Sequence, residues 1–266
     1  MVVFSCCSVA FTAFAEETTI HEYYINAETG NDESGTGTSG TPFLTLNEVI
    51  AQANTDGYNQ AGHTVIVHVT NTSGATTNLL GASSITFECD VKLIGDTANT
   101  VFSFSTGFQF SGEGSLTLKN IKLNPTSGWQ NFSFGNKDIY IEEGCTISSN
   151  NGWYCAANST SGNSTTNVQE FVFKASVPSF YLAANNYTAT FNNRFDLVYD
   201  VAGGTQTYYI GCKRGPTETG GPFSTTFNDA INFNIKNAAQ IKFAIPQTGN
   251  PRYFTLDAPI QIINSA

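Results

Sequence analysis

The stretch from residue 85 to residue 148 repeats one pattern three times and limits the possible folds more than any other feature. The three copies begin at Ile85, Phe108 and Asn131, and their starts are 23 residues apart. Each copy contains two short segments in which apolar and polar residues alternate, as in a strand with one buried face. Two short strands in every 23 to 25 residues are typical of one rung of a solenoid, which buries its apolar face only by stacking on other rungs.

The second segments of the three copies predict how the rungs align. VKLIG begins at Val91, LTLKN at Leu116 and IYIEE at Ile139, at spacings of 25 and 23 residues. The corners before them are rich in Gly, Asp, Asn and Ser, which favour turns and leave no room for a crossover helix. We therefore expect equivalent strands to pair in parallel, with these apolar residues stacked in buried rows: Ile85, Phe87, Val91, Leu93, Phe108, Phe110, Leu116, Leu118, Ile121, Ile139 and Ile141.

A helix is predicted ahead of the rungs. Leu46, Val49, Ile50 and Ala53 are spaced at i, i+3, i+4 and i+7, so they form one apolar face over 46–53. A helix here would cover the apolar cross-section and the unpaired strand edge of the first rung. The first strand after this helix is expected at 63–69, HTVIVHV.

Two segments resemble a known family. Segment 108–124, FQFSGEGSLTLKNIKLN, resembles a rung of the right-handed parallel β-helix of the pectate-lyase-like superfamily. The N-terminal part resembles the capping motif of many extracellular right-handed β-helix proteins, through Gly30-Asn31-Asp32, Pro42-Phe43, Thr45-Leu46 and Val49-Ile50. The resemblance implies an all-β fold, a single-stranded right-handed parallel β-helix (solenoid) with an N-terminal capping helix. A right-handed path also agrees with the general rule for parallel connections.

Three regions are expected along the chain. Residues 1–15 have the length of a signal peptide and end in Ala13-Phe14-Ala15, an A-x-A cleavage pattern. A buried first strand is the rival interpretation, and no Lys or Arg precedes the apolar run. Residues 16–62 would form the N-terminal strand, loop and capping helix, and 63–266 the β-helix. The chain ends directly after a strand pattern, which predicts either truncation at the C-terminus or an atypical last rung.

Composition limits the partners. The net charge is −10, with eleven Lys and Arg spread along 266 residues, so the sequence has no basic stripe for nucleic acid. An acidic polysaccharide would be repelled as well unless a metal ion bridged it. The apolar run at the N-terminus is too short to span a membrane. The signal peptide therefore predicts a secreted or cell-surface protein whose partner is an extracellular glycan or a cell-surface or host protein.

Aromatic residues form a possible binding ladder. The pairs Gly107-Phe108, Gly128-Trp129 and Gly152-Trp153 recur 21 and 24 residues apart, and Tyr154 would extend the series. An exposed ladder of Trp129, Trp153 and Tyr154 would stack on sugar faces, whereas an interior ladder would serve packing. The interior position is favoured, because burial removes the large surface of these rings from water.

The superfamily resemblance implies polysaccharide cleavage, but the residues for it are sparse. A lyase needs acids for calcium and a basic residue, and a glycosidase needs two or three carboxylates on adjacent rungs. Acids and bases come close in sequence only around Asp196, Asp200, Lys213 and Arg214, beside Arg194. The N-D, D-D, H-G and R-x-K pattern of polygalacturonases is absent.

We therefore expect a non-catalytic, adhesin-like, glycan-binding or structural module. It would bind through the loops at 148–167 and 211–222. A polysaccharide lyase or glycoside hydrolase is the alternative. No metal or other cofactor is expected, except calcium under the lyase alternative.

Four cysteines remain after the predicted cleavage. Cys145 and Cys155 flank a short polar loop and would form a disulfide in an exported protein. The alternative is that they are free, small apolar residues inside the rungs.

Overall fold

The computed structural model consists mostly of strands. One helix and 23 strands lie within the part of the chain that it describes. The predicted signal peptide lies outside this part, as do most residues of the loops at 148–167 and 211–222. The structure describes residues 18–71, 73, 77–97, 99–104, 108–125, 130–133, 138–142, 144–147, 153–157, 164–173, 180–182, 186–200, 207–210, 223–229, 231–236, 240–243, 252–256 and 260–264.

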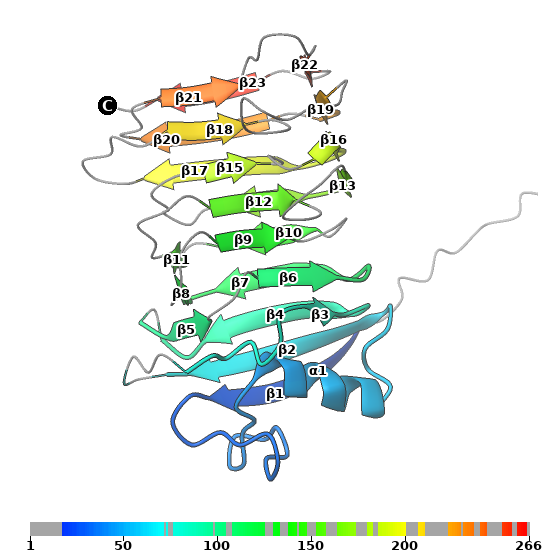
Figure 1. Ribbon diagram of the computed structural model, residues 1–266, viewed down its shortest axis with the longest axis vertical. Helices are drawn as coiled ribbons and strands as arrows, with labels where there is room; N and C mark the ends of the chain where they lie inside the picture. Colours follow the sequence, from blue (N-terminus) through cyan, green and yellow to red (C-terminus); the bar gives the residue numbers. More distant parts are fainter. Residues whose placement is uncertain are drawn as a thin grey trace, which may run out of the picture.

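One long parallel sheet runs from end to end of the stack of strands (Figure 1). Every neighbouring pair in it is parallel. Its nine strands follow one another in chain order: β1 (Thr19–Asn26), β2 (His63–Thr70), β4 (Asp90–Gly95), β7 (Leu116–Lys119), β10 (Ile139–Ile141), β14 (Phe171–Phe173), β17 (Phe195–Asp200), β20 (Ile231–Lys236) and β23 (Ile260–Asn264).

Three further parallel sheets accompany the long one. The seven-stranded sheet contains β3 (Ile85–Thr86), β6 (Phe108–Ser111), β9 (Gln130–Ser133), β12 (Trp153–Ala157), β15 (Phe180–Leu182), β18 (Thr207–Ile210) and β21 (Gln240–Phe243). The three-stranded sheet contains β5 (Val101–Phe104), β8 (Lys122–Pro125) and β11 (Thr146–Ile147). The four-stranded sheet contains β13 (Ser164–Val168), β16 (Asn186–Phe191), β19 (Phe223–Phe227) and β22 (Arg252–Leu256).

The chain visits these sheets in a repeating order. From β3 to β11 each circuit passes through the seven-, nine- and three-stranded sheets, and from β12 to β23 through the seven-, four- and nine-stranded sheets. Each circuit therefore adds one strand to the long sheet. Equivalent strands of the long sheet become neighbours although 23 residues (Leu116 to Ile139) to 36 residues (Phe195 to Ile231) separate them from β2 onward, and they pair in parallel as the repeat predicts.

The predicted register of the second segments is confirmed. Val91 pairs with Leu116 and Leu116 with Ile139, and all three side chains are fully buried. The row continues through Phe171 and Phe195, whose rings stack with centroids 5.1 Å apart. The alternation of apolar and polar residues thus places one continuous row of apolar side chains in the core.

The register expected for the first segments is wrong by one or two residues. Ile85 pairs with Phe110 rather than Phe108, and Phe108 pairs with Phe132 rather than Asn131. The second segments are 25 and then 23 residues apart, and the corners absorb the difference in length. Because Ile85 and Phe110 are 25 residues apart, as are Val91 and Leu116, the corners between these strands have the same length in the first two repeats. A uniform spacing of 23 would make them unequal.

The predicted helix is confirmed as α1 (Leu46–Thr55), which ends two residues after the expected position. Its buried residues are Leu46, Val49, Ile50 and Ala53, and they share one core cluster with β1 and β2. The helix lies beside β1 and β2 at the N-terminal end of the stack (Figure 1). The apolar face of α1 therefore packs against the first strands of the long sheet.

The G-N-D loop holds the start of α1. Asp32 accepts hydrogen bonds from the backbone N–H groups of Leu44 and Thr45, at 2.8 and 3.0 Å, and from the Thr45 hydroxyl at 2.8 Å. The Thr45 side chain in turn accepts from the Glu48 N–H and caps the helix. Asp32 therefore has a structural role in linking the loop to the helix.

The outer edge of β1 is covered by the same loop. Tyr24 N–H donates to the Gly37 carbonyl at 2.9 Å, and Asn26 N–H donates to the Phe43 carbonyl at 3.0 Å. Phe43 N–H donates back to Tyr24 and forms an isolated parallel bridge with Ile25. These bonds satisfy backbone groups that another strand would otherwise pair with.

Candidate functional site

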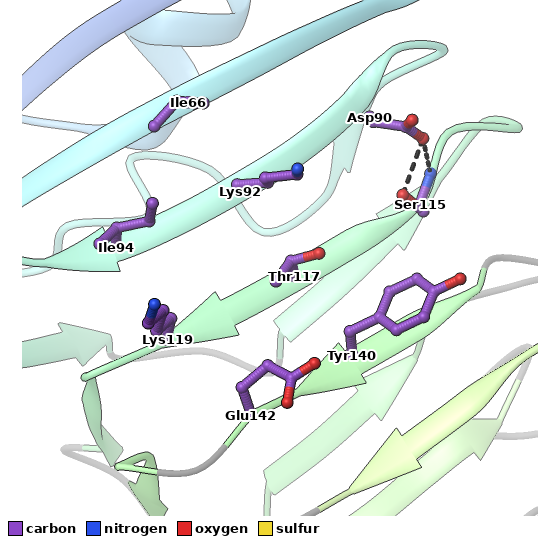
Figure 2. A pocket seen from close by; sticks show the side chains of 9 residues that line it. All are labelled: Ile66, Asp90, Lys92, Ile94, Ser115, Thr117, Lys119, Tyr140 and Glu142. Atoms are coloured by element: carbon purple, nitrogen blue, oxygen red, sulfur yellow. Dashed lines mark hydrogen bonds between the residues drawn. The ribbon is translucent and has the colours of Figure 1, made fainter.

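An open depression of about 560 Å³ lies on the outer face of the long sheet. Figure 2 shows β4 on one side of it, β10 on the other and β7 between them. The residues that line it alternate with the buried rows, because successive side chains of a strand point to opposite faces. They are Ile66, Asp90, Lys92, Ile94, Ser115, Thr117, Lys119, Tyr140 and Glu142.

Apolar and hydroxyl groups form much of this surface. Ile66 and Ile94 contribute aliphatic side chains, and Thr117 lies between Lys92 and Tyr140 in one cross-strand row. The Tyr140 hydroxyl donates a hydrogen bond of 3.0 Å to Glu170. Burial, and then this bond to a carboxylate, raise the pKa of Tyr140, so its phenol stays neutral. The ring is thus a fixed flat surface beside hydroxyl groups.

Two lysines provide positive charge. Lys92 pairs with Thr117 and Lys119 with Ile94, so the two lysines are diagonal neighbours on β4 and β7. Within the described residues, neither ammonium group has a hydrogen bond or an ion pair. Lys122, outside the depression, instead donates to Asn99 at 2.7 Å. The depression therefore holds two cationic donors that are available to a ligand.

Two carboxylates, Asp90 in the lining of the depression and Asp138 next to β10, accept hydrogen bonds from the backbone. Asp90 accepts from the N–H and the hydroxyl of Ser115, at 2.9 and 2.7 Å. One oxygen of Asp138 accepts from the N–H groups of Gln169 and Glu170, at 2.8 and 3.1 Å. Each of these two carboxylates thus links the start of one strand to the chain segment that forms the next strand of the sheet.

The charge on Asp138 is destabilised by its surroundings. Burial is the main cause, and the carboxylates of Glu170 and Asp90 add to it, whereas the two backbone N–H bonds act in the opposite direction. The net result is a pKa of Asp138 above its ordinary value. Sequence reasoning missed this group because Asp90, Asp138 and Glu170 come from three separate circuits of the chain. Their shared position at the start of each second segment was the signal that could have found them.

The catalytic candidates from the sequence are only partly described. Asp196 lies on β17, and Arg194 donates to it through Nε at 2.9 Å and through its terminal nitrogen at 2.7 Å. This contact raises the pKa of Arg194 further. The side chain of Asp200 lies outside the described residues, as do Lys213 and Arg214 entirely. Arg194 and Asp196 thus form an ion pair that does not line the depression.

The aromatic ladder has a different register from the one expected. Trp153 pairs with Gln130 and Phe108 with Phe132, so Phe108 and Trp153 are two positions out of line. Trp129 lies outside the described residues, and so do the side chains of Trp153 and Tyr154. A sugar-binding role for these three residues stays a prediction.

The described cysteines and potential metal ligands do not form a site. Cys145 is a free, buried thiol, and burial raises its pKa to about 11. The side chain of Cys155 lies outside the description, so a bridge between the two stays a prediction. Among the described residues, no group of three or more His, Cys, Asp and Glu side chains is placed to hold a metal ion. No helix in this part is long and apolar enough to cross a membrane.

In comparisons with known proteins, no family model matches the chain, and neither a curated protein nor a solved structure matches it.

Proposed function

We propose that this chain is a right-handed parallel β-helix that acts outside the cell as a non-catalytic glycan-binding module. The repeating order of the sheets, the parallel pairs and the continuous buried row from Val91 to Phe195 support the β-helix. The position of α1 beside β1, with its apolar face buried, supports a cap at the N-terminal end. A secreted or cell-surface location rests on the signal peptide expected at 1–15.

The depression is the observation that carries the binding function. A sugar ring has apolar C–H faces and hydroxyl edges, so it is recognised by a flat aromatic surface together with hydrogen-bonding groups. Tyr140 provides the ring, Thr117 provides a hydroxyl, and Lys92 and Lys119 provide donors. The surface is open, which suits a polymer chain that passes across several strands.

The engagement of two nearby acids supports a function without cleavage. Glycosidic cleavage needs an acid and a base within hydrogen-bond reach of the reacting atoms. Asp90 and Asp138 are instead used as acceptors for the backbone of the neighbouring circuit. We therefore assign both carboxylates to the structure of the sheet.

A polysaccharide lyase or glycosidase is the second candidate, and Asp138 favours it. An acid with a raised pKa near a binding surface is a feature of general acid catalysts. To separate the two candidates, the purified chain is incubated with pectate, alginate and neutral glycans in the presence of calcium. We expect no new reducing ends and no ultraviolet-absorbing unsaturated product. A product lost in Asp138→Asn, or in Lys213→Ala or Arg214→Ala, would establish the enzyme instead.

Binding is tested separately with a glycan array and titration of the best ligand. Lys92→Ala and Lys119→Ala are each expected to weaken binding about tenfold, equivalent to about 1.4 kcal/mol. Lys122→Ala is the matched control, because it removes the same charge outside the depression. Equal losses in all three variants would mean that net charge, and not this site, governs binding.

A further inference from the structure

A stacked cluster of rings joins three segments at the N-terminal end of the stack. His21 lies on β1, His63 begins β2, and Tyr58 lies in the connection between α1 and β2. Nε2 of His21 and Nδ1 of His63 are 2.9 Å apart. The Tyr58 ring lies flat on His21, with ring centroids 3.5 Å apart and an interplanar angle of 7°. None of these residues lines the depression.

The hydrogen bonds determine where the protons of the two imidazoles lie. The Gln60 amide nitrogen is 3.1 Å from Nε2 of His63, so this amide donates and Nε2 accepts. Neutral His63 then carries its proton on Nδ1 and donates it to Nε2 of His21. The network is complete only when both imidazoles are neutral.

Protonation disrupts this arrangement. A proton added to Nε2 of His21 would face the N–H of His63 across 2.9 Å, which places two donors against each other. The charged ring would also be partly buried against Tyr58 and next to His63. Burial and the nearby His63 lower the pKa of His21, and they outweigh the Asp56 carboxylate, which raises it. Both Asp56 oxygens already accept bonds, from Tyr23 at 2.8 Å and from Gln52 at 2.9 Å.

We propose that the His21–His63 pair is an acid-sensitive latch, which holds β1 and the α1–β2 connection in place at neutral pH and loosens them in acid. The pair is a side-chain link between the edge strand and β2, and Tyr58 extends it toward the end of α1. Loosening therefore reaches the N-terminal end of the stack first, while the buried rows of the later strands stay closed.

Hydrogen exchange of the purified full chain tests the latch, at about pH 7 and about pH 5, the range over which histidine changes charge. Exchange is corrected for its intrinsic pH dependence. We expect protection in the peptides covering 19–26 and 56–66 to fall about tenfold in acid, because the folded state binds a proton on His21 less readily than the unfolded state does. Peptides covering β7 and β10 should keep their protection.

Two variants and one control complete the test. His21→Phe keeps a ring on Tyr58 and removes the imidazole on which the disruptive proton would lie, so its loss of protection in acid should be much smaller than that of the wild type. His63→Gln removes the N–H that faces Nε2 of His21, and it provides a second variant if His21→Phe fails to fold. His68→Gln is the control, because His68 lies on β2 and stacks on Tyr24 outside the cluster. The proposal is wrong if the wild type keeps its protection in acid, or if both variants show the same acid-dependent loss as the wild type.

Discussion

Tyr140 donates a hydrogen bond of 3.0 Å from its hydroxyl to Glu170, and this bond connects the depression to the residue that precedes β14. The two residues are 30 positions apart in the chain. The bond explains how an aromatic ring on the outer face of a sheet is held in one orientation. The contributions of the Tyr140 ring and of Glu170, which holds it, can be tested by separate substitutions.

Removal of the ring should weaken glycan binding more than removal of its anchor. We expect Tyr140→Ala to lower affinity at least about tenfold, and Tyr140→Phe to lower it less, because Phe keeps the stacking surface. Glu170→Ala should resemble Tyr140→Phe. Isothermal titration with the best array ligand measures all three, and circular dichroism checks folding. Unchanged affinity in Tyr140→Ala would place the binding site elsewhere.

The buried rows should dominate stability. Leu118 is fully buried, and its replacement by Ala leaves a cavity in the core, so we expect unfolding free energy to fall by about 2–5 kcal/mol. Thr117→Ala, on the same strand but facing outward, should change it by about 0.5 kcal/mol or less. Urea denaturation measures both variants. Similar effects of the two changes would contradict the assignment of faces.

The link between the G-N-D loop and α1 should contribute measurably. Asp32→Ala removes the acceptor of three hydrogen bonds, so we expect a loss of about 1–3 kcal/mol in unfolding free energy. Glu33→Ala is the control at the neighbouring exposed position. Addition of calcium should not alter the melting temperature of either protein. A calcium-dependent increase that Asp32→Ala abolishes would show that Asp32 binds the ion.

Asp138 should make the protein less stable at neutral pH than a neutral residue would. Its pKa is raised in the folded state, so folding is favoured when the group is protonated. The penalty is absent below the ordinary Asp pKa of 3.8 and is complete above the folded-state pKa.

The variant Asp138→Asn keeps an oxygen for the N–H groups of Gln169 and Glu170 but carries no charge. We expect it to melt at a higher temperature than the wild type at neutral pH, and to lose this advantage as pH falls toward 3.8. Calorimetry across this range measures the difference. A variant that is less stable at every pH would mean that the charged hydrogen bonds outweigh burial.

The local sequence pattern was sufficient to predict the helix and the second strands, but not the register of the strands that the corners determine. The helix over Leu46 and the second strand of each repeat were predictable, because the period of the apolar residues reports which face is buried. The first strand of each repeat was misaligned, because the pairing of Ile85 with Phe110 depends on the lengths of the corners, which the repeat pattern does not give. The expected aromatic ladder likewise depended on a register that the corner lengths decide.

The sequence by itself determined that the chain forms short strands that alternate buried and exposed residues, with an amphipathic helix before them. It did so because side-chain burial in strands and helices follows a local period. Only the tertiary structure decided which outward residues meet. Asp90 reaches Ser115 across 25 residues and Tyr140 reaches Glu170 across 30, because stacking brings different repeats into contact. The position of each outward side chain therefore depends on the register of whole circuits, which varies with the length of every corner and is not encoded in any one repeat.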